Sequence, residues 1–142
     1  MNDGGSPATI YLLDTSAVLT LLEDEAGADR VQQILRSGQV LLPFVVPLEV
    51  FYVSVQERGE RLGHVRYGML KALRVVHVNE VTEPVVLMAG RFKARYPISL
   101  ADALIAAFAR CHDAVLVHKD PDYEVLREGL RLESLPYKVV RR

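Results

Sequence analysis

The sequence lacks the features of a secreted or membrane-bound protein. It contains a single cysteine, Cys111, so that no disulfide can form within the chain and a reducing compartment is expected. The longest apolar run, residues 40–48, is interrupted by Pro43 and Pro47 and is far too short to span a bilayer. The opening segment MNDGGSP has neither the basic start nor the apolar centre of a signal peptide. We therefore expect a cytoplasmic protein that does not contact a membrane.

Internal repeats and low-complexity segments are also absent, and the composition is that of one globular domain. The chain has 142 residues, of which 50% are hydrophobic and 25% are charged, which is enough for a sizeable core. We expect residues 1–7 to form a flexible tail and residues 8–142 to form a single domain. The net charge of −1 does not by itself indicate a class of partner.

Short apolar runs alternate with amphipathic segments along the chain. Strands are expected at residues 8–13, 40–46, 74–78, 115–118 and 131–135, and helices at 17–22, 26–36, 47–58, 62–73, from 82 to a stop at Pro97, at 99–111, and briefly after 123. Such alternation is typical of βαβ units with right-handed crossovers. The pattern therefore predicts an α/β fold with a mostly parallel sheet and helices on both of its faces.

The segment SLADALIAAFARC, residues 99–111, predicts a buried helix that carries a carboxylate. Apolar side chains recur on nearly all of its sides, and Cys111 is expected in the core with them. Asp102 lies in the first turn, where Ser99 and Asp102 have the spacing of a capping box. A helix cap is one interpretation of Asp102. A functional carboxylate is the other, because a buried charge is costly unless something compensates it.

Three further acids fall at the same kind of position as Asp102. Asp14 follows the first expected strand, Glu49 lies at the start of the helix after the second, and Asp120 follows the fourth. In a parallel α/β sheet, the carboxyl ends of the strands and the N-termini of the helices share one edge, where ligands bind. Capping explains each acid singly, but it does not explain why none of the four positions holds Asn, Thr or Ser.

Four carboxylates gathered at one edge cannot all stay ionised unaided, because like charges raise each other's pKa. A divalent cation resolves the repulsion, and an all-oxygen pocket without His or Cys suits Mg²⁺ or Mn²⁺. Such an ion polarises a phosphoryl oxygen and activates a bound water, which is the chemistry of metal-assisted phosphodiester hydrolysis. Neutralising four acids would also leave the chain mildly basic, which is compatible with a polyanionic ligand.

The segments around these acids resemble those of a known family. They are LLDTSAVLTLL around Asp14, VPLEV around Glu49, SLADALIAAFA around Asp102 and VHKDPDY around Asp120, in this order along the chain. Together they are similar to the PIN-domain ribonucleases, and above all to the VapC-like toxins of bacterial and archaeal toxin–antitoxin pairs. The resemblance extends from about residue 9 to residue 139.

The resemblance implies a three-layer α/β/α sandwich with a five-stranded parallel sheet, and a Mg²⁺-dependent endoribonuclease that cleaves single-stranded or looped RNA. It implies a Mg²⁺ (or Mn²⁺) site in which Asp14 and Asp102 are the principal ligands, completed by Glu49 and Asp120 directly or through water. These four are the expected catalytic residues. The partners that the resemblance implies are the RNA substrate, an antitoxin protein that blocks the acidic pocket, and a second copy of the chain in a homodimer.

Three residues beside the acids complete the comparison with the family. Ser16 matches a hydroxyl that often supports the first aspartate, and Asp122 matches a frequent second acid, interpreted here as a helper or turn former. His118 is a departure, because the family usually has Thr or Ser two residues before the fourth acid. A histidine at a strand end is either a structural residue or a group that makes activity respond to pH near neutrality.

Two other classes of protein are alternatives to a nuclease. A catalytically inert PIN-like module would bind RNA or protein, and the complete set of four acids counts against it. A phosphotransfer enzyme or receiver domain also has acids at strand ends. However, a haloacid-dehalogenase phosphatase needs an acid at the position of Ser16, and the segment RVVHVNE offers no aspartate where a receiver domain needs one.

Overall fold

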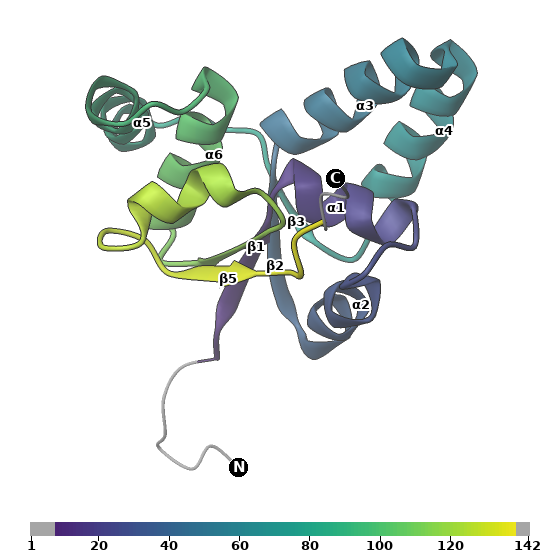
Figure 1. Cartoon of the computed structure of the whole chain (residues 1–142), viewed down its shortest axis with the longest axis horizontal. Helices are drawn as coiled ribbons and strands as arrows, with labels where there is room; N and C mark the ends of the chain where they lie inside the picture. The colour runs from purple at the N-terminus through teal and green to yellow at the C-terminus, as the bar shows by residue number, and fades with distance from the viewer. Residues whose placement is uncertain (1–7, 139–142) are drawn as a thin grey trace.

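The five strands of the computed structural model form one parallel sheet (Figure 1). The structure describes residues 8–138, so that the expected tail, 1–7, and the end of the expected domain, 139–142, lie outside the described residues. The strands are β1 (Ile10–Leu13), β2 (Gln39–Pro43), β3 (Val76–Val78), β4 (Val115–His118) and β5 (Leu132–Ser134). Their order is β3-β2-β1-β4-β5, and every neighbouring pair is parallel, which confirms the predicted five-stranded parallel sheet.

Helices fill the connections between the strands. They are α1 (Thr15–Leu22), α2 (Ala28–Ser37), α3 (Val45–Arg58), α4 (Glu60–Lys71), α5 (Glu83–Arg95), α6 (Leu100–Cys111) and the 3₁₀ helix η1 (Pro121–Leu126). With right-handed crossovers, the strand order places α1 to α4 on one face of the sheet and α5, α6 and η1 on the other. Figure 1 shows α5 and α6 on the opposite side of the sheet from α1 and α2. The predicted α/β/α sandwich is therefore present.

The core lies on both faces of the inner strands of the sheet, as β1 and β4 show. Leu12 and Leu13 on β1, and Leu116 and Val117 on β4, are fully buried. Strands that are covered on both faces have continuous apolar sequences rather than alternating ones, which explains the runs ATIYLL and AVLV. Among the described helices, none combines the length and the hydrophobicity that a membrane span requires.

Helix α6 is buried along its middle but not at its ends. Ile105 and Phe108 are fully buried, whereas Leu100 is 62% exposed and Cys111 is exposed. The prediction that Cys111 lies in the core is therefore wrong. Neighbouring elements cover only the central turns of the helix, so that apolar residues at both of its ends remain in contact with solvent.

Helix α3 begins two residues earlier than the sequence predicts. The expected strand 40–46 ends at Pro43, the helix starts at Val45, and Pro47 lies in its first turn. A proline is tolerated there because the first backbone N–H groups of a helix have no intrahelical partner. Glu49 therefore lies beyond the first turn, and the prediction that it starts the helix is wrong. Its carboxylate is not an N-terminal cap.

Candidate metal centre

The carboxyl ends of β1 and β4 lie side by side where the connections of the sheet change direction. From β1 the chain proceeds to β2 and β3 on one side, whereas β4 and β5 lie on the other side. The backbone amide of Asp14, directly after β1, donates to the carbonyl of Val117 on β4 at 3.1 Å. Such a switch point is where parallel α/β sheets usually bind their ligands.

Asp14 is the most enclosed of the predicted site residues. It caps α1, because its carboxylate accepts from the backbone amide of Ala17 at 2.8 Å. The Ser16 hydroxyl donates to the two carboxylate oxygens at 2.7 and 2.8 Å, and accepts from the amide of Lys119 at 2.8 Å. Burial nevertheless raises the pKa of Asp14 to about 7. The fold therefore holds this carboxylate firmly, but its ionised form lacks a compensating charge.

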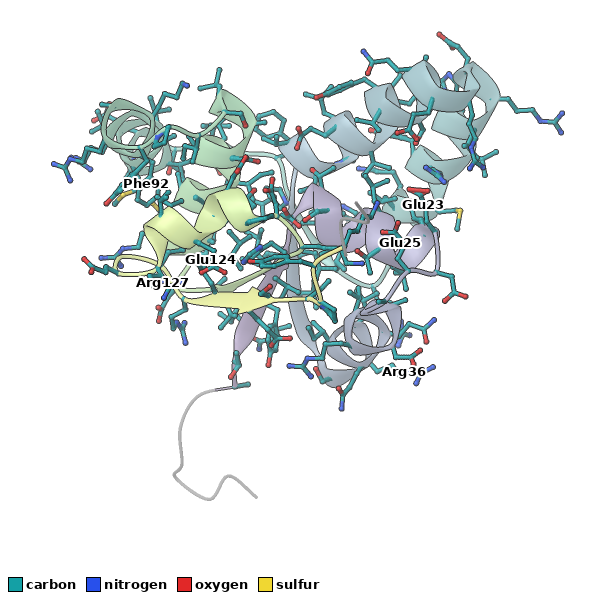
Figure 2. All side chains as sticks on the ribbon, in the orientation of Figure 1. Glu23, Glu25, Arg36, Phe92, Glu124 and Arg127 are labelled. Atoms are coloured by element: carbon teal, nitrogen blue, oxygen red, sulfur yellow. The ribbon has the colours of Figure 1, made fainter. Side chains whose placement is uncertain are left out.

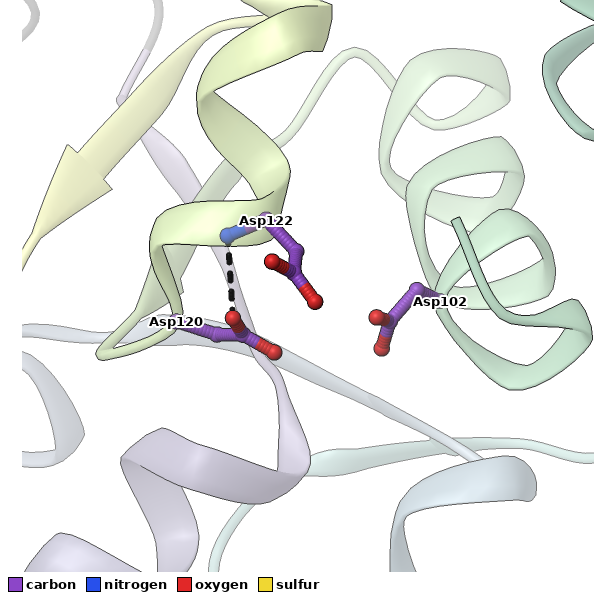
Figure 3. Close-up of side chains that lie close together, drawn as sticks. All are labelled: Asp102, Asp120 and Asp122. Carbon is purple, nitrogen blue, oxygen red and sulfur yellow. Dashed lines mark hydrogen bonds between the residues drawn. The ribbon is translucent and has the colours of Figure 1, made fainter. Parts of the chain in front are cut away.

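Three other acids of the site lie close together. Asp102, Asp120 and Asp122 each offer a carboxylate oxygen, and these oxygens lie within 4.8 Å of one another. Figure 3 shows the three carboxylates turned toward a common space, with the amide of Asp122 donating to Asp120 at 2.9 Å. Asp102 comes from the first turn of α6, whereas Asp120 caps η1 and Asp122 lies in the first turn of η1. Two connections that are distant in sequence thus build the group.

Asp102 is more than a helix cap. The predicted cap is present, because the Ser99 hydroxyl accepts from the Asp102 amide at 3.1 Å. The carboxylate itself accepts from the hydroxyl of Tyr123 at 3.0 Å, across the site. Burial, together with the charges of Asp120 and Glu49, raises the pKa of Asp102 to about 6, against the lowering effect of the Tyr123 hydrogen bond. The interactions that perturb the pKa of Asp102 thus come from α3, through Glu49, and from η1 and its cap, through Tyr123 and Asp120.

Glu49 is held by hydroxyl groups rather than by cations. Thr15 at the start of α1 donates to one carboxylate oxygen at 2.6 Å, and Tyr52, one turn further along α3, donates to the other at 3.4 Å. Thr15 follows Asp14 directly in sequence. The helix that begins at the end of β1 therefore orients the first acid and the second acid together.

The structure brings the predicted residues to one edge of the sheet, in two tiers. The oxygens of Asp102, Asp120 and Asp122 form the tight group, and Asp14 and Glu49 lie outside it. They remain within electrostatic reach, because Asp102 and Asp120 raise the pKa of Asp14, and Glu49 raises that of Asp102. Asp122, interpreted from the sequence as a helper or turn former, thus lies within the tight group, together with Asp102 and Asp120.

His118 occupies the place of the family's hydroxyl as a buried acceptor. The residue is fully buried, and its Nδ1 accepts from the amide of Asp120 at 3.1 Å. Its ring packs against that of Tyr123, with 5.1 Å between the centroids. Burial lowers the pKa of His118, which favours the neutral imidazole at pH 7. This arrangement corresponds to the structural interpretation of the histidine.

Two residues that the sequence interpretation did not assign to the site contact its acids. Thr15 follows Asp14 in the segment LLDTSAVLTLL, and its hydroxyl contacts Glu49. Tyr123 ends the segment VHKDPDY, and it is fully buried with its hydroxyl on Asp102. No local pattern distinguishes a tyrosine that only packs from one whose hydroxyl reaches a carboxylate 21 residues earlier in the chain.

The charge of the acids is not balanced by a lysine or arginine of the described part of the chain. Within residues 8–138, no lysine or arginine forms an ion pair with any of the five carboxylates. Lys119, which precedes Asp120 in sequence, lies instead 3.7 Å from Glu25, and Lys138 lies 3.0 Å from it. Glu25 belongs to the loop after α1 (Figure 2). An all-oxygen donor set in which the pKa values of Asp14 and Asp102 are raised, and which pairs with no described lysine or arginine, fits a hard divalent ion such as Mg²⁺ or Mn²⁺.

Comparisons with known proteins agree with this architecture. The family model described as PIN domain matches residues 11–129, a segment that includes all five acids. No curated protein matches the chain.

Several solved structures are similar in fold. VapBC2 from Rickettsia felis, bound to a DNA fragment from its promoter, has a TM-score of 0.72 at 15% identity, over 90% of this chain and 100% of that chain. VapC20 from Mycobacterium tuberculosis, described as a sarcin-ricin loop cleaving toxin, has a TM-score of 0.63 at 20% identity, over 81% and 93%. VapBC-5 from the same organism, a member of the VapBC family of toxin–antitoxin systems, has a TM-score of 0.58 at 16% identity, over 90% and 98%.

Proposed function

Because the chain belongs to the PIN domain family, we propose that it is an endoribonuclease that hydrolyses RNA phosphodiester bonds with the help of Mg²⁺ or Mn²⁺. The observation that carries the proposal is the group of carboxylates at the edge of the sheet, with oxygens within 4.8 Å of one another. Their charge has no protein counterpart among residues 8–138. A divalent cation supplies that counterpart, and it also lets a polyanionic substrate approach the acids.

Five carboxylates are available to hold the ion: Asp14, Glu49, Asp102, Asp120 and Asp122. When bound, the ion supplies Lewis acidity that polarises a phosphoryl oxygen and lowers the pKa of water. We assign catalytic roles to the first four of these residues, as the family resemblance implies, and a supporting role to Asp122. Ser16 supports the site through its bonds to Asp14.

The chain's own contribution is to orient these carboxylates before a substrate arrives. Ser16 and the amide of Ala17 hold Asp14, and Thr15 holds Glu49. All of these donors belong to the first turn of α1. A site whose polar groups are already aligned does not have to reorganise during the reaction, which is the main advantage of a preformed site.

The likeness to toxin–antitoxin structures supports a proposal for the biological role. We propose that this chain is the toxin of such a pair, that residues 8–142 are its nuclease domain, and that an antitoxin protein covers the acidic edge. We also propose a homodimer in the cytoplasm. Copurification of the chain with the product of a neighbouring gene, followed by light scattering of the isolated chain, tests the partner and the dimer.

Cleavage of a pooled single-stranded RNA by the purified protein tests the activity. The assay is run with Mg²⁺, with Mn²⁺ and with EDTA, beside the variants Asp102→Asn and Asp113→Asn. Asp113 is the matched control, because it is an exposed acid paired with Arg131 at the opposite end of β4. We expect cleavage by the wild type and by Asp113→Asn, and its loss in EDTA and in a folded Asp102→Asn.

The same assay separates the nuclease from the inert module. If Mg²⁺ raises the melting temperature but no RNA in a diverse pool is cut, the metal site stands and the chain acts by binding. If the divalent ions neither stabilise the protein nor support cleavage, the metal site itself is wrong. Cleavage that persists in EDTA would also contradict the proposal.

A further inference from the structure

Tyr123 lies in the wall of the acidic site. It belongs to η1, a short 3₁₀ helix, and it is fully buried although Asp122 before it is exposed. Its ring packs against His118, with 5.1 Å between the centroids. These contacts involve only the ring, so that phenylalanine would satisfy them equally well.

The hydroxyl of Tyr123 makes a contact that packing does not require. It donates to Oδ1 of Asp102 at 3.0 Å, from η1 to the first turn of α6. A buried hydroxyl without a partner is costly, and here the partner is a carboxylate of the site. Burial raises the pKa of Tyr123 well above its ordinary value. The group therefore remains a protonated donor throughout the physiological range.

The hydrogen bond restricts Asp102 at the point where the acids meet. One oxygen of Asp102 lies within 4.8 Å of oxygens from Asp120 and Asp122. A carboxylate at the first turn of a helix can rotate about its side-chain torsions, and a fixed donor on Oδ1 limits that rotation. The same η1 segment supplies Asp122 and the donor, so that the position of η1 and the orientation of Asp102 are coupled.

We infer that Tyr123 is a positioning residue, whose hydroxyl sets the orientation of the Asp102 carboxylate and thereby the affinity of the site for a divalent cation. The inference rests on the proposed metal site. It adds to that site an aromatic hydroxyl which is neither a ligand nor a group that touches the reacting atoms.

Binding of Mn²⁺ by Tyr123→Phe is the direct test, with the free ion measured by electron paramagnetic resonance. Hydrogen-bonded supports of metal ligands typically contribute about 10- to 100-fold to affinity, so we expect the dissociation constant to rise by about tenfold or more. Tyr137→Phe is the matched control. Its hydroxyl donates to Glu124 at 2.6 Å, and its ring also lies near His118, at 6.2 Å. We expect its Mn²⁺ affinity to stay close to that of the wild type.

Each other outcome contradicts the inference in a recognisable way. Equal Mn²⁺ affinity of the wild type and Tyr123→Phe overturns it and leaves the proposed nuclease intact. Equal losses of Mn²⁺ affinity in Tyr123→Phe and Tyr137→Phe indicate general loosening around His118, and they overturn the inference as well. If Tyr123→Phe fails to melt cooperatively without metal, the hydroxyl maintains the fold rather than the ligand. If the wild type binds no Mn²⁺, both this inference and the proposed metal site fail.

Discussion

Asp14, the most buried of the five acids and here called the buried end of the site, and Asp122, here called its exposed end, differ in how much of their geometry the fold supplies. Asp14 is 3% exposed and accepts hydrogen bonds from Ser16 and from the amide of Ala17. Asp122 is exposed, on a short 3₁₀ helix, and its amide donates to Asp120. The buried end is thus set in place by backbone and helix capping, whereas the exposed end depends on a turn.

The comparison also shows where the site is under electrostatic stress. Burial raises the pKa of Asp14 to about 7, although its hydrogen bonds act in the opposite direction. Asp122, by contrast, is exposed, so that its carboxylate keeps its contact with water. A bound cation should therefore stabilise the ionised carboxylate at the buried end more than the one at the exposed end. Substitutions there should have larger effects than substitutions at the exposed end.

The largest expected effect is that of Asp14→Asn on RNA cleavage. Asparagine preserves the shape of the side chain and an oxygen for the amide of Ala17, but removes the negative charge. Since a bound metal contributes several kcal/mol to the stabilisation of the transition state, we expect kcat/KM to fall on the order of 10³-fold. Steady-state cleavage with saturating Mg²⁺ measures the change. Asp113→Asn, at an exposed site that tolerates asparagine, should stay within about twofold of the wild type.

The next effect is the pH dependence of the free energy of unfolding without metal. Folding raises the pKa of Asp14 from 3.8 to about 7, so its protonated form is favoured in the folded state. The stability that protonation provides is fully present below about pH 4 and is lost as the pH rises through 7. Between these limits the loss is about 1.4 kcal/mol per pH unit for this group. Asp102, whose pKa is raised to about 6, adds a contribution of the same sign.

Urea unfolding in EDTA at pH 5, 6, 7 and 8 measures this dependence. We expect the wild type to lose stability relative to Asp14→Asn over this range, by on the order of 3 kcal/mol in total. Added Mg²⁺ should restore the most stability to the wild type at the upper end of this pH range, because the ion binds the ionised carboxylates. Parallel curves for the two proteins would show that Asp14 is already ionised at pH 5, and that its burial carries no such cost.

Ser16→Ala should weaken the buried end without removing a charge. The hydroxyl donates to Asp14 and accepts from the amide of Lys119, so it connects the ends of β1 and β4. Groups that orient metal ligands typically contribute about 10- to 100-fold to metal affinity or activity, and we expect a loss of that size in kcat/KM. Ser16→Thr retains the hydroxyl and is the matched variant. If both variants lose activity equally, the effect comes from packing in α1 rather than from the hydrogen bonds.

The buried end is also the part of the site that the sequence predicts best. Asp14 follows an apolar run, and a residue at the end of a buried parallel strand must lie at the ligand-binding edge. The same reasoning places Asp120. The alternation of runs and amphipathic segments predicts the parallel sheet for a similar reason, because strands that are covered on both faces are apolar throughout.

What the sequence did not predict depends on packing between elements. The position of Glu49 in α3 follows from where the helix begins, and Pro47 is compatible with more than one start. The contact of Tyr123 with Asp102, and the exposure of Cys111, depend on how η1 and the ends of α6 meet their neighbours. Local periodicity carries no information about such contacts.

The smallest expected effect is that of Asp122→Asn, at the exposed end. The asparagine retains the backbone amide that donates to Asp120, so the turn before η1 is kept. Exposed charges are screened by solvent and contribute about 0.2–1 kcal/mol, so we expect kcat/KM to fall only about threefold.

The position of Asp122 within 4.8 Å of Asp102 and Asp120 makes this variant the sharpest test of the comparison. Its cleavage rate and Mn²⁺ affinity should be measured beside those of Asp14→Asn, under identical salt. If Asp122→Asn lowers the cleavage rate and the Mn²⁺ affinity as much as Asp14→Asn does, the exposed acid is a principal ligand. The burial of a carboxylate then does not determine how much it contributes to the site. If it loses only a few-fold while Asp14→Asn is inactive, the difference between the two ends follows from the constraints that the fold places on each carboxylate.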